Sequence, residues 1–222
     1  MTGGDLTQEQ IRPMIAAERM ELADLLAGLP EAAWDSPTLC EGWRVREVVS
    51  HMTMAYRYSM LRVVFGIAKA GGNFNRMADR AARKDAEELT SGQLVASLRE
   101  NVDHPWKPPG GGYEGALSHD VIHGLDITTG LGLDRTVPAD RVRVVLGDLS
   151  TKNLKYFGTD LHGVELRATD LDFAIGSGKP VTGRAQDILL ALCGRKLPHD
   201  RLRGEQAPRF TQRFNGRTDH DR

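Results

Sequence analysis

The segment Glu114-Gly-Ala-Leu-Ser-His-Asp-Val-Ile-His-Gly-Leu-Asp-Ile-Thr-Thr-Gly-Leu131 decides the fold of this chain. Its apolar residues Leu117, Val121 and Leu125 recur every four positions, which predicts a helix with one apolar face. At about 100° per residue, the two histidines of the segment lie on the opposite face. A breaker-rich loop at 105–112 precedes the segment. The sequence therefore predicts one helix of a bundle, with an apolar side and a histidine side.

Helical periodicity also covers most of the chain around this segment. The further predicted helices are Gln8–Leu29, Arg44–Ala70, Asn75–Asn101 and Pro138–Tyr156. In the first of them, a one-faced 3.6-residue pattern runs through Ile11, Ile15, Leu22, Leu25 and Leu29. Thr90 or Ser91 is a candidate cap inside the third.

The pattern changes after Gly158. Val164–Thr169 alternates as a strand does, and Asp172–Ile175 is the candidate partner strand. Val181–Leu192 is predicted to be a helix that ends before a glycine. The predicted fold is mainly α, a bundle of helices with a small C-terminal α/β segment. We expect a helical bundle over residues 1–158, an α/β segment over 159–214 and a disordered tail over 215–222.

Composition limits the classes of function. The 222 residues carry a formal net charge of -1, so no overall positive field favours nucleic acid or an anionic membrane. The first ten residues are polar and no apolar run approaches the roughly 20 residues of a membrane span, so we expect a cytoplasmic protein. Cys40 and Cys193 are then expected to be free thiols. A homodimer is compatible with a bundle of this size, but no exposed stripe in the sequence predicts one.

Three histidines form the candidate site. His119 and His123 are four residues apart, so on a helix their Cβ atoms lie roughly 5–6 Å apart on one face. Two imidazoles placed in this way can bind one divalent metal ion. His51, in the predicted helix at 44–70, is the candidate third ligand. Three neutral histidines leave coordination positions open, as in catalytic metal sites.

The spacing of these histidines is also compatible with roles that involve no metal. On spacing alone, a pair of histidines in this pattern is more often a surface or core pair than a metal site. His51 lies about 130° from the apolar stripe of its helix, whereas a core histidine should lie within the stripe. Periodicity leaves two positions for all three side chains, facing solvent or lining a second, more polar contact zone.

Two motifs resemble a known enzyme family. The run Ala33-Trp-Asp-Ser-Pro-Thr-Leu-Cys-Glu-Gly-Trp-Arg-Val-Arg-Glu-Val-Val-Ser-His51 resembles the start of the mycothiol-dependent maleylpyruvate isomerase family, within the DinB-like metalloenzyme superfamily. The segment from His119 to Asp126 resembles the second metal motif of that family. The resemblance continues through 168–176 and 181–195, and covers roughly residues 8–205.

The resemblance implies a DinB-like four-helix bundle that binds a divalent metal, Zn²⁺ first and Ni²⁺ second, through His51, His119 and His123. It also implies mycothiol as co-substrate. One position departs from the family, because the maleylpyruvate isomerase is expected to have a glutamate where this chain has His119. Losing that negative ligand leaves more of the metal's charge uncompensated, so a bound water or thiol should ionise more readily. The departure keeps the metal site and argues against maleylpyruvate as substrate.

Two chemistries remain open for such a site. In the favoured one, the metal keeps a low-molecular-weight thiol as the thiolate, which then transfers to a small electrophilic substrate or isomerises it. In the alternative, metal-bound water is the nucleophile of a hydrolase. A non-catalytic, metal-binding regulatory module is the competing class, because ligands alone do not make a catalyst.

Several polar residues near the motifs have candidate roles that the sequence supports less strongly than it supports the three histidines. Asp126, three residues after His123, is placed to orient a ligating imidazole, and a solvated carboxylate is the equal alternative. The cations Arg76, Arg80, Arg184 and Arg195 are candidate contacts for an anionic group, but residues of this kind are more often plain surface charges. Cys40 is a conceivable fourth ligand, although a packed loop thiol is expected.

Overall fold

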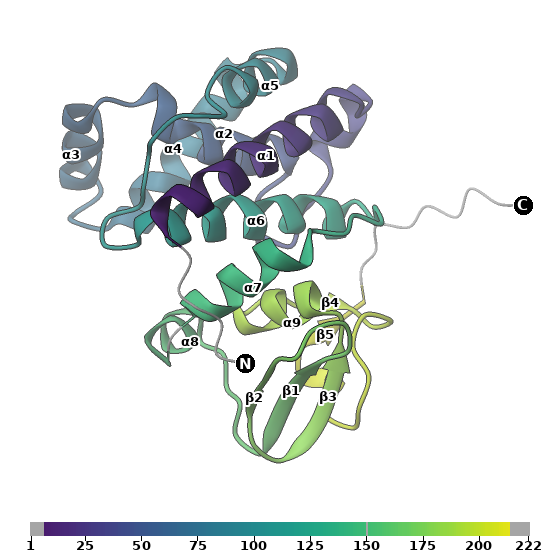
Figure 1. The fold of residues 1–222 in the computed structure, drawn as a ribbon. Helices are drawn as coiled ribbons and strands as arrows, with labels where there is room; N and C mark the ends of the chain where they lie inside the picture. Colours follow the sequence, from purple (N-terminus) through teal and green to yellow (C-terminus); the bar gives the residue numbers. More distant parts are fainter. Residues whose placement is uncertain (1–6, 150, 214–222) are drawn as a thin grey trace, which may run out of the picture.

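A computed structural model describes residues 7–149 and 151–213 (Figure 1). The fold is mainly helical with a small sheet near the C-terminus, as predicted. Four helices form the bundle: α1 (Gln8–Ala27), α2 (Val45–Arg57), α5 (Ser91–Arg99) and α6 (Gly112–Gly130). Each of them packs against two of the others, so that the four enclose one core. Within the described residues, no helix is long and apolar enough to cross a membrane.

Apolar side chains from all four helices fill the bundle core. Representative members are Leu22, Val49, Met52, Leu98 and Ile127. Trp34, on the short 3-10 helix η1 (Glu31–Asp35), is fully buried in the same core. The loop between η1 and α2 is therefore held against the bundle, which fixes where α2 begins.

The predicted helix at 44–70 is wrong in one respect, because it is two helices. α2 ends at Arg57, Tyr58 is extended, and α3 (Met60–Lys69) begins with a new N-cap. The Ser59 hydroxyl accepts a hydrogen bond from the Arg62 backbone N–H. Arg57 and Tyr58 both donate to the buried Asp85 carboxylate, which anchors the break. The apolar pattern runs through this break and therefore does not reveal it.

The predicted helix at 75–101 is also divided. α4 (Phe74–Glu88) packs on α2 and carries α3 on its other side, whereas α5 belongs to the bundle. Thr90 caps α5, since its hydroxyl accepts from the Gln93 backbone N–H at 3.2 Å. The expected internal cap therefore marks a true helix start.

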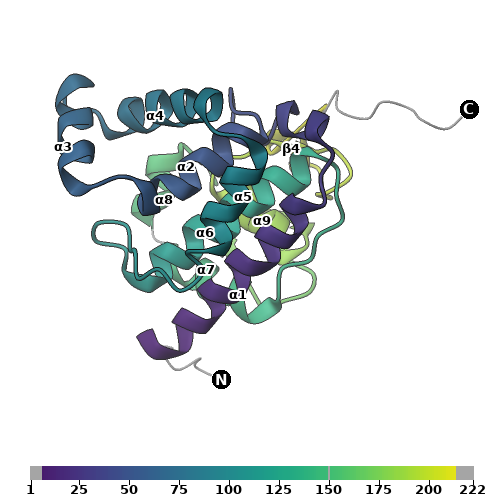
Figure 2. The same ribbon diagram turned by 90° about the horizontal axis from the view of Figure 1, so that it is seen from above.

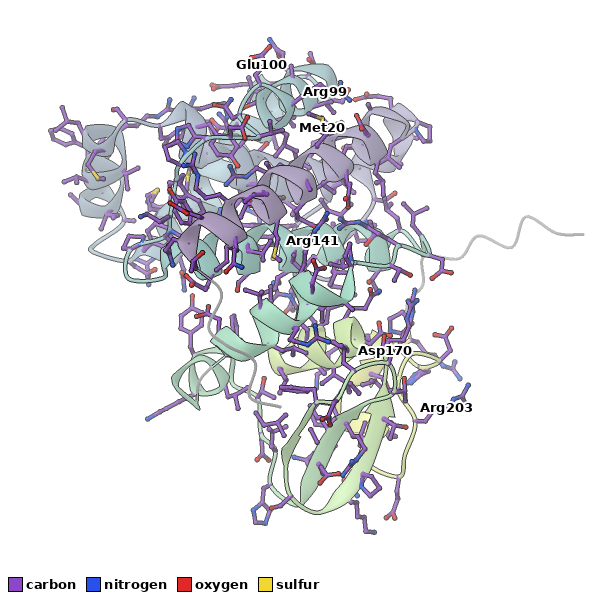
Figure 3. The ribbon with its side chains drawn as sticks, viewed as in Figure 1. Met20, Arg99, Glu100, Arg141, Asp170 and Arg203 are labelled. Atoms are coloured by element: carbon purple, nitrogen blue, oxygen red, sulfur yellow. The ribbon has the colours of Figure 1, made fainter. Side chains whose placement is uncertain are left out.

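The predicted helix at 138–156 likewise becomes two, α7 (Ala139–Asp148) and α8 (Thr151–Phe157), with extended backbone at Leu149. α7 is attached to α1 by Arg141, whose guanidinium bonds to Glu18 and Glu21 (Figure 3). This network, in which Arg141 and Glu18 are buried and Glu21 is exposed, attaches the C-terminal half of the chain to the bundle.

The C-terminal segment is a three-stranded sheet covered by a helix. The central strand β1 (Val164–Ala168) pairs antiparallel with β2 (Ala174–Gly176), close to the predicted pairing. β3 (Lys179–Gly183) pairs parallel with β1, and α9 (Ala185–Leu192) packs on β1 and β3. The helix predicted at 181–192 is therefore wrong in its first residues, which are a strand. A short pair, β4 (Leu197–Pro198) and β5 (Thr211–Gln212), was not predicted.

The helices α7 and α9 lie between α6 of the bundle and the sheet (Figure 1). A second apolar core joins α1 and α6 to β1 and α9, through Ile15, Leu117, Val121, Leu166 and Ile188 among others. This core contains residues from both sides of the predicted boundary at 158/159, a division that stays a prediction. The tail at 215–222, predicted to be disordered, lies outside the described residues.

Candidate metal centre

The three predicted histidines lie together between α2 and α6. Their ring centroids are 4.9 to 5.2 Å apart. Nε2 of His51 and Nε2 of His119 are separated by 3.3 Å, although the two residues are 68 positions apart in the chain. One ring nitrogen from each of His51, His119 and His123 lies within 4.8 Å of the other two. Two distant segments thus direct three imidazoles at one point.

The local structure explains this convergence. On α2, the apolar residues Val45, Val49 and Met52 point into the bundle core, which leaves His51 on the side towards α6. On α6, Leu117 and Val121 face the second core, so the two histidines face α2. Helical periodicity left two positions for the histidines, facing solvent or lining a polar contact zone. The structure places them in a polar contact zone between helices.

Each α6 histidine is backed by a buried carboxylate. His119 Nδ1 lies 3.0 Å from Asp120 Oδ1, and His123 Nδ1 lies 3.1 Å from Asp126 Oδ2. A carboxylate only accepts hydrogen bonds, so each Nδ1 carries the proton and donates. Each Nε2 is then an unprotonated lone pair. This is the form in which histidine binds a metal.

Each carboxylate is in turn held by an arginine from a distant element. Arg19 on α1 bonds to Asp120 at 2.7 Å, and both side chains are almost fully buried. Arg195, after α9, bonds to both oxygens of Asp126 at 2.8 Å. The second pair ties the C-terminal segment directly to the histidine site. Neither arginine was predicted in this role, and Asp120 was not predicted to contact His119.

The electrostatics favour neutral histidines beside ionised carboxylates. Burial would raise the pKa of Asp120 and Asp126, but their bonds to arginine and histidine hold each pKa below its ordinary value. Burial lowers the pKa of His123. Burial, together with the two neighbouring imidazoles, lowers the pKa of His51 well below its ordinary value. Two of the three rings therefore resist protonation and keep their lone pairs free.

Arg19 also fixes the loop that covers the site. Its Nη1 donates to the backbone carbonyls of Asn101, Val102 and His104. Two residues further on, the Trp106 ring lies 5.1 Å from the His119 ring, edge to face. One buried guanidinium therefore places both the loop and the carboxylate behind His119.

Aromatic rings form the walls of the site. The Trp43 ring lies 5.1 Å from the His51 ring and donates from Nε1 to Asp79. Trp106 forms the opposite wall against His119. The His104 ring lies 5.1 Å from the Tyr56 ring, with the two planes tilted by 55°, and His104 also lines an open pocket of about 500 Å³ between α1 and its own loop. Aromatic rings and the two buried carboxylates thus surround the imidazoles.

The other candidate residues lie in varied places. Cys40 Sγ, a ring nitrogen of His123 and a carboxylate oxygen of Asp126 lie within 4.8 Å of one another, so Cys40 borders the site. Burial raises the pKa of its thiol to about 11, which keeps it protonated.

Arg184 pairs with Asp134 and Asp187. Arg76 and Arg80 bond to backbone carbonyls at the end of α3 and its following turn. Both cysteines are free, as expected.

The donor set fits a divalent ion. Two nitrogen ligands, each about 2.0–2.1 Å from one tetrahedral zinc ion, are separated by about 3.3 Å. His51 and His119 have that Nε2 separation. His51 Nδ1 is buried and has no hydrogen-bond partner among the described residues. The polar contact of this buried ring is therefore made at Nε2, and a cation could be held between the facing Nε2 atoms of His51 and His119.

Comparison with known proteins supports the resemblance seen in the sequence. Residues 15–105 match the family model of the mycothiol maleylpyruvate isomerase N-terminal domain. No curated protein sequence matches the chain at a significant level.

Among solved structures, the crystal structure of the mycothiol-dependent maleylpyruvate isomerase matches with a TM-score of 0.59 at 15% identity, over 93% of this chain and 97% of that one. A histidine-to-alanine mutant of that isomerase matches over the same shares of the chains with a TM-score of 0.58, also at 15% identity. Identity this low establishes the fold alone. Residues 15–105 are therefore similar to the mycothiol maleylpyruvate isomerase N-terminal domain, and the whole chain has a fold similar to that of the isomerase.

Proposed function

We propose that this chain is an enzyme that uses a metal and a low-molecular-weight thiol, mycothiol, to transfer sulfur to a small electrophile or to isomerise it. The observation that carries the proposal is the 3.3 Å separation of the His51 and His119 Nε2 atoms beside His123. His51, His119 and His123 are the proposed ligands. The family of the N-terminal domain supports mycothiol as the thiol.

A divalent ion held by these residues would lower the pKa of a bound thiol, so that sulfur is present as the nucleophilic thiolate. In transfer, a carbon–sulfur bond forms and the thiol is consumed: with an alkyl halide the carbon–halogen bond breaks and halide leaves, and with an activated alkene the double bond is lost and its other carbon takes up a proton. In isomerisation, the carbon–sulfur bond forms, the substrate rotates about the former double bond, and the same bond breaks, which returns the thiol. The two reactions are therefore distinguished by the stoichiometry of thiol loss.

The residues of the chain have separate tasks in this proposal. Asp120 and Asp126 hold the Nδ1 protons of His119 and His123, and so keep each Nε2 directed at the metal position. Trp43 and Trp106 limit the access of water and offer flat apolar surfaces to the substrate. The ordered walls place the reacting atoms near one another.

The substrate class follows from the cations around the site. Arg19 and Arg195 are the guanidinium groups that bond to the site's carboxylates, and each is already paired there. Neither is free to bind a carboxylate of the substrate. The aromatic walls instead fit an uncharged electrophile, such as an activated alkene or an alkyl halide. This agrees with the expectation that maleylpyruvate is not the substrate.

Elemental analysis of the purified protein tests the metal ligands. We expect about one divalent ion per chain in the wild type and a large loss in the double variant His119→Ala/His123→Ala. His162→Ala, an exposed histidine in the C-terminal segment, is the matched control and should keep the metal. Equal metal content in the wild type and the double variant would show that His119 and His123 do not bind the metal.

Thiol chemistry is tested with the metal-loaded protein. Mycothiol binding is measured by calorimetry, and turnover by the loss of thiol and of an activated alkene or halide. We expect binding and turnover in the wild type and neither in the double variant. Tight thiol binding without turnover on any electrophile would support a non-catalytic module. Hydrolysis of an ester or amide without thiol binding would support a hydrolase.

A further inference from the structure

The outer side of α3 is apolar and exposed. Seven large hydrophobic side chains are exposed among the described residues, and four of them lie on this one short helix. They are Met60, Leu61, Val64 and Phe65, with exposed fractions of 77%, 71%, 55% and 67%. We name these four residues the α3 face. Contiguous apolar surface of this kind on a water-soluble domain marks an interaction site.

The four residues form one stripe. Positions 60, 61, 64 and 65 are neighbours at helical spacing, so their side chains share one side of the helix. No charged residue is among them. α3 lies at the outer edge of the molecule, beyond α4, in both ribbon views (Figures 1 and 2). The α3 face is therefore directed away from the rest of the chain.

The opposite side of α3 already has a partner. Val63 and Ile67 pack with Met54, Met77 and other residues between α2 and α4. Gly66 allows a close approach, because a Cβ at this position would lie 2.8 Å from Met77 Cγ. Every residue of α3 nevertheless remains exposed or half-buried. α3 is thus fixed to the molecule by one side only, and its more apolar side stays uncovered.

A groove between α3 and α4 continues the α3 face. It has a volume of about 380 Å³, with Phe65, Gly66 and Met77 in its lining and arginine and lysine residues at its rim. A raised apolar stripe beside an apolar groove can pair with a copy of itself, since a two-fold axis places each stripe against the other's groove.

We propose that the α3 face and this groove form a two-fold interface between two copies of this chain. The exposed surface of the α3 face amounts to roughly 500 Å² per chain, so that a symmetric pair would bury up to about 1,000 Å² of it, which together with the groove reaches the lower limit of specific interfaces. A stripe without charge suits self-pairing, because two-fold symmetry places like residues near one another. The inference does not depend on the proposed enzymatic function.

The charges at the rim argue against an acidic partner or an anionic membrane. Lys84 already pairs with Glu88. Arg62 stacks over the Tyr58 ring, 3.6 Å from its centroid, and lies 3.8 Å from Asp85. These two cations are largely compensated within the chain, so the rim offers less positive potential than its composition suggests. The apolar surface is left as the main source of affinity.

A matched pair of variants tests the interface by sedimentation velocity over a range of protein concentration. Met60→Glu changes the α3 face, and Met20→Glu makes the same change at an exposed methionine of α1 (Figure 3). Phe65→Glu places a carboxylate where the α3 face meets the groove. Because one substitution adds two charges to a symmetric interface, we expect Met60→Glu and Phe65→Glu to weaken dimerisation by about 100-fold or more.

The expected result is a wild-type dimer, a Met20→Glu dimer of unchanged affinity, and monomers for the two α3 variants. Unchanged circular dichroism and melting temperature would show that the variants are folded, as their exposed positions predict. A wild type that is monomeric up to millimolar concentration would overturn the proposal. So would dimers that survive Phe65→Glu, or that Met20→Glu disrupts equally.

Flotation with vesicles of phosphatidylcholine and phosphatidylglycerol tests the alternative that the α3 face binds a membrane surface and not a second copy of the chain. We expect no binding of the wild type to these vesicles. Binding by a monomeric wild type that is lost in Met60→Glu and Phe65→Glu would assign the α3 face to a membrane surface, and would overturn the dimer. Metal content should stay equal in all these proteins.

Discussion

At the scale of single residues, the carboxylates behind the imidazoles make the site more than a cluster of three histidines. Asp126 accepts from His123 and is held by Arg195. Asp126→Asn keeps the size of the side chain but removes its charge. Loss of such an outer contact lowers metal affinity by about 10- to 100-fold. We therefore expect the zinc dissociation constant of Asp126→Asn to rise by that factor in a competition titration with a chromogenic chelator.

The same substitution also leaves Arg195 without its counter-charge, which costs on the order of 3 kcal/mol of unfolding free energy in a buried pair. Asp172→Asn, in the turn between β1 and β2, is the control and should change neither quantity. Zinc affinity that is equal in Asp126→Asn and the wild type would show that this carboxylate does not orient a ligand.

A second residue-scale prediction concerns Glu47 at the start of α2. Burial would raise the pKa of Glu47, but hydrogen bonds from the Arg44 side chain and backbone outweigh it and hold the pKa below its ordinary value of 4.5. An acid with a depressed pKa stabilises the fold above its unfolded pKa, and this contribution is lost as pH falls through the folded pKa.

Glu47→Gln should therefore lower the unfolding free energy at pH 7 by about 1 kcal/mol, the worth of one cap or hydrogen bond. The difference between the variant and the wild type should shrink as pH falls below about 4.5. Urea unfolding at pH 7 and at a series of lower pH values measures this. A difference that is constant across the series would mean that the charge of Glu47 plays no part.

Residue spacing placed the three histidines away from the apolar stripes of their helices, and the family resemblance then singled them out as metal ligands. Arg19 could have been found by the same rule. It lies four residues after Ile15 and three before Leu22, in the gap of the apolar stripe of α1, where a charged residue must be buried and paired. Asp120 had no such signal. Its contact with the adjacent His119 depends on side-chain rotation, which helical periodicity does not describe.

At the scale of elements, the closest approach near the site is between α6 and the loop that leads into α2. A Cβ on Gly130 would lie 2.7 Å from Thr38 Cα and 2.9 Å from the Pro37 carbonyl oxygen, both backbone atoms. Gly130→Ala must therefore displace this loop, and we expect a loss of about 1–3 kcal/mol in unfolding free energy. Urea unfolding measures it.

Gly147→Ala is the matched control, because Gly147 also lies in a helix but has no atom within 4 Å of its Cβ position. It should raise the unfolding free energy by about 0.5–1 kcal/mol, since alanine is the better helix former. If the two variants changed stability in the same direction, the close contact of α6 with the loop would not be the cause.

The elements themselves were predicted unevenly. The long periodic segments α1 and α6 are where the sequence indicates, because each has apolar residues at helical spacing along its length. The breaks at Tyr58 and Leu149 were missed, because the hydrophobic period continues across them and neither contains glycine or proline. Residues 181–183 of β3 fall within the predicted helix, since only the pairing with β1, some 15 residues earlier, makes them a strand.

At the scale of the whole molecule, the site depends on parts of the chain that the sequence assigned to separate units. Arg195 comes from the C-terminal segment and Arg19 from the first helix, and both hold carboxylates of α6. The second apolar core spans the same elements. A ligand that stabilises α6 should therefore stabilise the α/β segment as well, although no residue of that segment is a proposed ligand.

Zinc binding tests this coupling. A ligand that binds only the folded state adds about 2.7 kcal/mol to the unfolding free energy at a concentration 100 times its dissociation constant. If the chain unfolds as one unit, zinc should slow amide hydrogen exchange in β1 and α9 as much as in α2 and α6, measured by mass spectrometry under conditions where exchange requires global unfolding. His119→Ala/His123→Ala should show no slowing in either part. Protection confined to the bundle would instead support two units divided near residue 158, because stabilisation of the metal-binding part would then not reach the α/β segment.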